Sequence, residues 1–230
     1  MSRICIIAAR RAPQGRFLGT LAKRSSTELG VAAGRAALSG VGPAAIDSVI
    51  VGNVLGVGRG MNLARQLGVG LGLPLETPAF TVNAMCASGM QAVLLAVQAI
   101  RAGDARSVLC GGTESMSTPP NLLDRARAGY RFGDGVLIDS LLKDGLTDPF
   151  GNSHMGLMAE RLAQRFGTRA RRRTPTPFAT NSATAPRTRP GTLLTTSCRW
   201  TFSTATSTCG PTRAWRNSAH SRQRSRQMAP

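Results

Sequence analysis

The sequence predicts an α/β fold in which helices cover both faces of a mostly parallel β-sheet. Three observations support this prediction. Short apolar runs alternate with longer segments of helical spacing through residues 1–167. The first of these runs, 4–9, is bounded by charged residues and by Pro13, as expected of a buried strand. The chain has 230 residues and is 42% hydrophobic, so it can bury a sizeable core.

The elements after this first strand follow from local signals. A helix is expected over residues 25–40, with Ser26 and Thr27 as candidate N-caps and Gly40 as the signal that ends it. A strand is expected over 47–55. The elements that come next are expected to be helix 62–72, strand 79–85, helix 88–104 and strand 107–112. A run rich in Gly, Pro and Asp, 119–151, then leaves the core before helical spacing returns over 153–166.

Cys86 has a position that suits a nucleophile. It lies between an apolar run that ends at Val82 and a helix that starts at the small residues Ala87, Ser88 and Gly89. The positive end of a helix dipole and free backbone N–H groups favour the thiolate form of a cysteine placed there. Small neighbours leave room for a substrate. The structural alternative is a small buried cysteine that only packs, and the position alone does not exclude it.

Charge divides the chain into two unlike segments. The net charge is +18, yet all 11 acidic residues and 17 of the 29 basic ones lie before Gly167. Residues 168–230 contain no acid, no Ile and no Val, and 21 of these 63 residues are Ser or Thr. Such a segment buries too little apolar surface to fold, so we expect a disordered tail. A basic nucleic-acid arm, a linker, a cloning scar and a reading-frame error are the possible origins of this composition.

The remaining composition favours a cytoplasmic protein without a membrane segment. The N-terminus lacks the pattern of a signal peptide, and no apolar run approaches the length of a membrane span. The five cysteines are odd in number, scattered and free of CxxC pairs, which disfavours a disulfide framework or a metal site and suits a reducing compartment. The glycine-rich stretch 56–60 matches no nucleotide-binding spacing and is expected to be a turn.

The stretch "VNAMCASGMQAVLLAVQAIRAGDARSVLCGGTESMS", which contains Cys86, resembles the nucleophile segment of the thiolase family. Two earlier stretches, "GRFLGTLAKRSSTELG" and "VIVGNVLGVGRGMNLARQ", resemble its first βα units, and "GYRFGDGVLIDSLLKDGLTDPFGNSHMGLMAERLAQRFG" resembles its loop domain. The likeness is collinear over residues 3–167 and is most similar to the acetyl-CoA C-acetyltransferase branch. It implies the N-terminal half of a thiolase-like layered fold with the start of a loop domain.

The resemblance also implies a chemistry. Cys86 would take an acetyl group from acetyl-CoA as a thioester and pass it to a second acetyl-CoA, giving acetoacetyl-CoA and CoA, or run the reverse thiolysis. Leu146, His154 and Met155 match family positions near the pantetheine and acyl pocket, although a purely structural role for His154 stays open. No metal and no separate cofactor are implied, because the CoA thioester is itself the substrate. A homo-oligomer is implied for a full-length chain.

In the family, the condensing base and a second cysteine lie in the C-terminal half, and the motifs that carry them are absent here. Reading the tail one base earlier converts "SCRWTF" at 197–202 into an allowed Ile-Val-Pro-Val-Asp-Val, which is similar to the family at that point. We therefore expect a frameshifted tail and a truncated chain that is inactive alone.

The predicted organisation is a core over residues 1–118, a loop-domain segment with the following helix over 119–167, and the tail over 168–230. Two rival functions stay open. One is a non-catalytic pseudogene product or scaffold. The other is a basic nucleic-acid-binding protein that uses the tail, although sparse aromatic residues there weaken this second alternative.

Overall fold

The computed structural model describes residues 4–168 and 202–203. Its centre is a five-stranded sheet in the order β1-β9-β4-β2-β3. The strands are β1 (Cys5–Ile6), β2 (Ser48–Gly52), β3 (Ala79–Val82), β4 (Ser107–Gly112) and β9 (Phe202–Ser203). Strand β2 pairs in parallel with both β3 and β4, whereas β9 is antiparallel to β1 and β4. The predicted mostly parallel sheet is confirmed.

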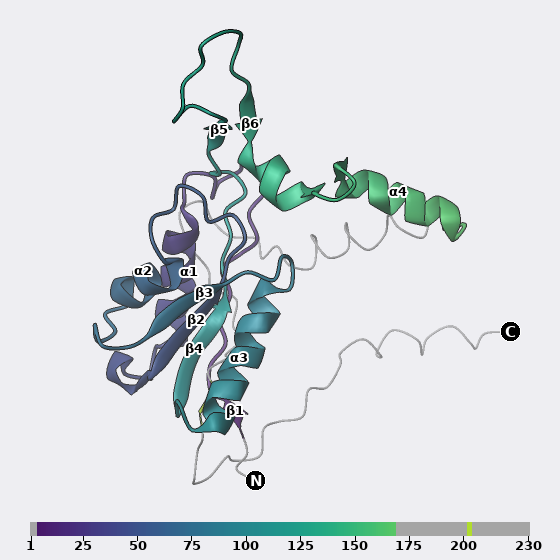
Figure 1. Cartoon of the computed structure of the whole chain (residues 1–230). Coiled ribbons are helices and arrows are strands. Elements are labelled where there is room, and N and C mark those ends of the chain that lie inside the picture. The colour runs from purple at the N-terminus through teal and green to yellow at the C-terminus, as the bar shows by residue number, and fades with distance from the viewer. Residues whose placement is uncertain (1–3, 169–201, 204–230) are drawn as a thin grey trace, which may run out of the picture.

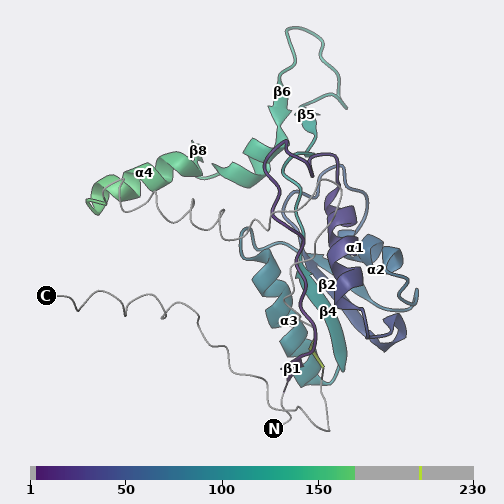
Figure 2. The ribbon, with the colours of Figure 1, turned by 180° about the vertical axis from the view of Figure 1, so that it is seen from behind.

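Helices cover both faces of this sheet, as the alternation of elements predicted. Figures 1 and 2 show α1 (Ser26–Ala37) and α2 (Leu63–Gly70) on one face and α3 (Ser88–Ala102) on the other. A short 3₁₀ helix, Pro43–Ala45, leads from α1 into β2. The result is a layered α/β domain.

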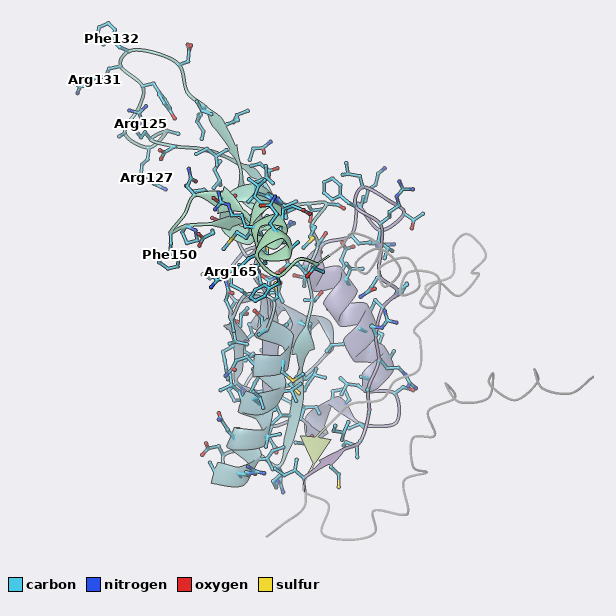
Figure 3. All side chains as sticks on the ribbon, turned by 90° about the vertical axis from the view of Figure 1, so that its right-hand side faces the viewer. Arg125, Arg127, Arg131, Phe132, Phe150 and Arg165 are labelled. Carbon is cyan, nitrogen blue, oxygen red and sulfur yellow. The ribbon has the colours of Figure 1, made fainter. Side chains whose placement is uncertain are left out.

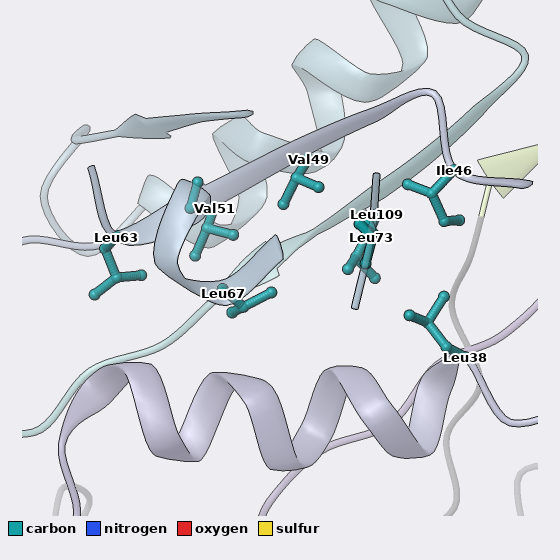
Figure 4. Close-up of a cluster of buried hydrophobic side chains, with 9 residues drawn as sticks. Leu38, Ile46, Val49, Val51, Leu63, Leu67, Leu73 and Leu109 are labelled. Atoms are coloured by element: carbon teal, nitrogen blue, oxygen red, sulfur yellow. The ribbon is translucent and has the colours of Figure 1, made fainter. Parts of the chain in front are cut away.

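The core lies in two layers because side chains alternate along the strands. Val49 and Val51 of β2 point toward α1 and α2, where they join a buried cluster with Leu67 (Figure 4). Ile50, between them, points the other way and packs with Ala92 and other residues under α3. Small residues on α3 let the helix lie close to the strands.

The helix ends follow local chemistry, with one correction. The N-cap of α1 is Ser25, one residue before the predicted candidates Ser26 and Thr27, and the helix ends at Ala37, three residues before Gly40. Ser25 Oγ accepts from Glu28 N at 3.1 Å and Ser25 N donates to Glu28 Oε2 at 2.8 Å, which is a capping box. Asn62 caps α2 by accepting from Arg65 N.

Strand β9 corrects the prediction for the tail. Phe202–Ser203 was expected to be unstructured, yet these residues pair with Cys5–Ile6 on one side and Ser107–Val108 on the other. Without them, facing edges of β1 and β4 would keep unpaired backbone groups. The remainder of the predicted disordered tail lies outside the described residues, as does the proposed nucleic-acid arm.

Residues 119–168 project from the core (Figure 1). They form a hairpin, a π-helical turn, two short strands and a helix, namely β5 (Asn121–Leu123), β6 (Leu137–Asp139), Leu141–Leu146, β7 (Thr147–Asp148), β8 (Ser153–His154) and α4 (Met155–Arg165). Figure 3 shows Arg125, Arg127, Arg131 and Phe132 on the loop beyond the hairpin strands, far from the sheet. Arg125 lies over the Tyr130 ring at 5.3 Å, which is a cation–π contact.

Helix α3 corrects the expectation about membrane-spanning length. We expected no apolar run of membrane-spanning length, yet the stretch Met85–Ala102 is long and apolar enough to cross a membrane by length and composition alone. In the described chain, 22% of this stretch is buried. Its contacts with β2 and β4 are those of a core helix in an α/β layer. Ile100 is buried in the cluster under the helix, whereas Met90 and Leu94 are 65% and 49% exposed.

Candidate active site

Cys86 occupies the turn that the sequence predicted for it. Strand β3 ends at Val82 and α3 begins at Ser88, so the cysteine lies two residues before the first helical residue. Its side chain is exposed. The N-cap, Ala87, offers no side-chain hydrogen bond, and Ser88 N donates to Met85 O at 2.9 Å, so the N–H groups of Gly89 and Met90 are the available donors of the first turn.

Glycines let the sheet come close to this turn. A Cβ atom at Gly52, the last residue of β2, would lie 2.4 Å from the carbonyl carbon of Ser88. A Cβ at Gly112, the last residue of β4, would lie 3.2 Å from Gly89 Cα. Real side chains do not tolerate the first distance, so β2 requires a glycine at this end. The start of α3 is thereby wedged against the carboxyl ends of two parallel strands, where sites in such sheets gather.

A cavity of about 340 Å³ opens at Cys86. The loop after β2 contributes Leu55, the segment after β4 contributes Met116, and the projecting segment 119–168 contributes Leu141. Its lining is therefore mostly apolar, with the sulfur as the reactive group. A pocket of this size and lining suits a small acyl chain or the thiol end of a carrier.

Two of the three predicted substrate-contacting residues lie at this cavity with Cys86. Leu146, at the end of the π-helical turn, and Met155, the first residue of α4, both line it. His154 does not. It is the N-cap of α4, and its Nδ1 accepts from Gly156 N at 3.0 Å. This capping bond supports a structural role for His154. Substrate contact by Leu146 and Met155 stays a prediction.

Glu114 is a site residue that the sequence reasoning missed. Its carboxylate accepts from Val54 N at 2.9 Å, Leu55 N at 3.2 Å and Asn53 Nδ2 at 3.0 Å. These bonds tie the loop after β2 to the segment after β4, and both segments line the cavity. The sequence shows only a charged residue two positions after a buried parallel strand, which does not reveal its backbone partners.

We expect Glu114→Gln to destabilise the fold by about 1–3 kcal/mol, because an amide nitrogen cannot accept from these backbone N–H groups. Urea unfolding measures this change in the free energy of unfolding. Glu76→Gln is the matched control, since it removes one negative charge from an exposed position. Equal stability of the two variants would contradict the bracing role of Glu114.

Cys110 differs from Cys86 in its electrostatic environment. It lies within β4 against the cluster under α3. Burial raises the pKa of the Cys110 thiol from 9.0 to about 12. The folded chain thus holds this proton at a pH where the unfolded chain releases it. The stability that comes from the neutral thiol is fully present below about pH 9 and is lost as pH rises toward about 12.

We therefore expect a Cys110→Ala variant to lose less stability than the parent chain between about pH 8 and pH 10.5. The difference between their slopes should not exceed about 1.4 kcal/mol per pH unit. Urea unfolding of both chains across this range measures it. Cys5 and Cys86 are present in both chains, so their titration cancels. Parallel pH profiles would show that burial does not hold the Cys110 proton.

Known proteins resemble this chain in its sequence. The family model for the thiolase N-terminal domain matches residues 4–187, a range that runs beyond Gly167. The acetyl-CoA acetyltransferase of Cupriavidus necator is 45% identical over 169 residues, covering 73% of this chain and 43% of that protein. The acetyl-CoA acetyltransferase of Allochromatium vinosum is 48% identical over 166 residues, covering 71% of this chain and 42% of that protein.

Solved structures agree. The Acat5 thiolase of Ascaris suum in complex with coenzyme A has a TM-score of 0.67 at 36% identity, covering 71% of this chain and 43% of that one. The Bacillus anthracis acetyl-CoA acetyltransferase has a TM-score of 0.70 at 33% identity, covering 74% of this chain and 43% of that one. The chain spans less than half the length of these relatives. On the family match and these likenesses together, the chain belongs to the thiolase family through its N-terminal domain.

Proposed function

We propose that Cys86 is the acyl-accepting nucleophile of an acetyl-CoA C-acetyltransferase. The observation that carries this proposal is the exposed sulfur at the mouth of an apolar cavity, between the end of β3 and the start of α3. The names of relatives that match this region support the same substrate class.

The first half-reaction needs only groups near this sulfur. The Cys86 thiolate attacks the carbonyl carbon of acetyl-CoA, and the carbonyl oxygen takes up the negative charge. The intermediate then expels CoA as a thiolate and leaves acetyl-Cys86. One thioester bond breaks and one forms, so the step is close to balanced in energy. Free N–H groups of the first helical turn are suitable donors to the transient oxyanion.

The second half-reaction needs a base. A proton must leave the methyl group of a second acetyl-CoA, whose carbanion then attacks acetyl-Cys86 and releases the Cys86 thiolate. Leu146 and Met155 would hold the acyl and pantetheine parts of the substrate against the cavity wall. The finer proposal is that the chain performs the first half-reaction but lacks the machinery for the second.

Acetylation of the chain by acetyl-CoA tests the proposal. We expect release of up to one CoA per chain, with a single acetyl group mapped by mass spectrometry to the peptide that contains Cys86. Cys86→Ala should abolish this acetylation. Cys110→Ala is the matched control, because it removes a thiol from a neighbouring strand and should leave acetylation of Cys86 intact.

The contrary result is an intact wild-type chain that folds yet takes up no acetyl group. That outcome would favour the non-catalytic scaffold or pseudogene product. Acetylation spread equally over the cysteines would also count against a dedicated nucleophile, because it would reflect general thiol chemistry.

We further propose that the residues from about 168 onward are an out-of-frame translation. The missing acids and the missing Ile and Val support this, as does the family-like string obtained from 197–202 in the earlier frame. Sequencing the DNA across the codons for residues 165–175 tests it. A restored frame should regain acidic residues at once and later encode a His and a second Cys in family-like motifs. If every downstream frame lacks them, this proposal fails.

A further inference from the structure

The turn that carries Cys86 contains a strained residue. Met85 has φ of 52°, in the left-handed region that side chains other than glycine rarely adopt. Ala87 N donates to Ala84 O at 3.1 Å, so residues 84–87 form a tight turn that contains both Met85 and the sulfur-bearing Cys86. Such a conformation persists only where the surroundings hold it, and strained positions of this kind concentrate at functional sites.

Two side chains hold this turn. Ser88 Oγ accepts from Ala84 N at 2.9 Å and donates to Met85 O at 2.6 Å. On the other side, Asn83 Oδ1 accepts from Met85 N at 2.9 Å. Together they bind both backbone polar groups of Met85, the residue directly before Cys86.

The direction of the Ser88 bonds is informative. A serine near a helix start usually accepts from N–H groups of its own first turn. Ser88 instead reaches back to the residues before Cys86, although it is itself the first residue of α3. It is 4% exposed, and its backbone is wedged against Gly52. Its hydroxyl therefore links the position of the turn to the position of the sheet.

We propose that Ser88 is a positioning residue that, with Asn83, fixes the Met85 turn so that Cys86 meets an acyl donor in the productive geometry. This inference rests on the proposed role of Cys86 as the nucleophile. It assigns no contact between Ser88 and the substrate. Removing the hydroxyl leaves the sulfur present and exposed but frees the turn to relax.

The test compares two reactions of the same sulfur. Acetyl transfer from S-phenyl thioacetate requires attack along a defined line on a carbonyl, whereas alkylation by iodoacetamide makes a weaker demand on orientation. Each reaction is followed at Cys86 by peptide mapping. We expect Ser88→Ala to slow acetylation by about 10–100-fold. Alkylation should change by less than about threefold, because the thiol itself is unchanged.

Asn83 provides the matched pair of controls. Asn83→Ala removes the other bond to Met85 and should shift the ratio of the two rates in the same direction. Asn83→Asp keeps the accepting oxygen and should keep the ratio of the two rates of the parent chain, because its added charge acts on the thiolate in both reactions. Because Asn83 is exposed, this pair also carries the test if Ser88→Ala fails to fold. Slow alkylation of Cys110 reports that each variant keeps its core.

An unchanged acetylation rate in Ser88→Ala and Asn83→Ala would overturn the proposal, as would an equal fall in both reactions. The small thioester separates this result from the proposed function. If S-phenyl thioacetate acetylates Cys86 and acetyl-CoA does not, the acetyl-CoA assignment fails while the positioning role is still measured.

Discussion

The 230-residue chain is expected to turn over acetoacetyl-CoA and CoA at least about 10⁴-fold more slowly than a complete thiolase, even where Cys86 accepts an acetyl group. General base catalysis contributes about 10²–10⁴ to such a rate, and one oxyanion donor about 10²–10³. These contributions do not simply multiply, so we take the lower combined value.

The physical reason is the absence of a suitable base among residues 4–168 and 202–203. The only histidine in that part of the chain is His154, and its Nδ1 already accepts from Gly156 N. His154 also lies outside the lining of the Cys86 cavity. Glu114 is occupied by backbone N–H groups and Asn53, so freeing it to take a proton would break the brace between β2 and β4.

The measurement is the loss of acetoacetyl-CoA absorbance, with the Cupriavidus necator relative assayed in parallel at equal molar concentration. Cys86→Ala is the control, and it should lower any remaining rate to the background of the reagents. Turnover at the rate of the complete relative would refute the expectation. It would also mean that residues outside the described part of the chain supply the base.

The sheet order was harder to predict than the elements. Strand 107–112 and the starts of α2 and α3 followed from apolar runs and small or capping residues, which act locally. Placement of β4 between β2 and β9 depends on the pairing of Val108 with Ser48 on one side and with Phe202 on the other, and contacts so far apart in the sequence leave no local trace. Phe202–Ser203 could not be predicted, because its surroundings in the sequence are polar and basic.

The candidate site divides in the same way. The placement of Cys86 was predictable because a cysteine between a strand and a helix start is encoded within ten residues. Glu114 was not, because its partners follow a different strand and meet it only through the parallel pairing of β2 and β4. The Met85 turn was also invisible, since a left-handed methionine has no sequence preference that signals it.

The outer face of α3 leads to the second large effect, which concerns the solution state of the chain. Met90 and Leu94 are exposed on this face, while the sheet covers the opposite side of the helix. Val93, Val97 and Ile100 of the same helix pack on the cluster under it, so they add little to this exposed face. The resemblance to thiolases implies that, in a full-length chain, a second similar half would pack on this helix.

We expect the purified chain to associate through this face, and Met90→Gln with Leu94→Gln to increase its monomer fraction severalfold. Glutamine favours helix almost as well as methionine and leucine, so α3 should persist. Burying each of these side chains contributes about 1.5–3 kcal/mol, so a symmetric pair of chains that buries four of them gains about 6–12 kcal/mol, a range that includes the ~8.2 kcal/mol of a micromolar complex. Size-exclusion chromatography with light scattering measures the monomer fraction.

Ile100→Ala is the contrasting variant, because it removes a side chain from the buried face of the helix. It should cost about 2–5 kcal/mol of stability without increasing the monomer fraction. A parent chain that is already a monodisperse monomer, with a single cooperative melting transition, would show that this face needs no cover.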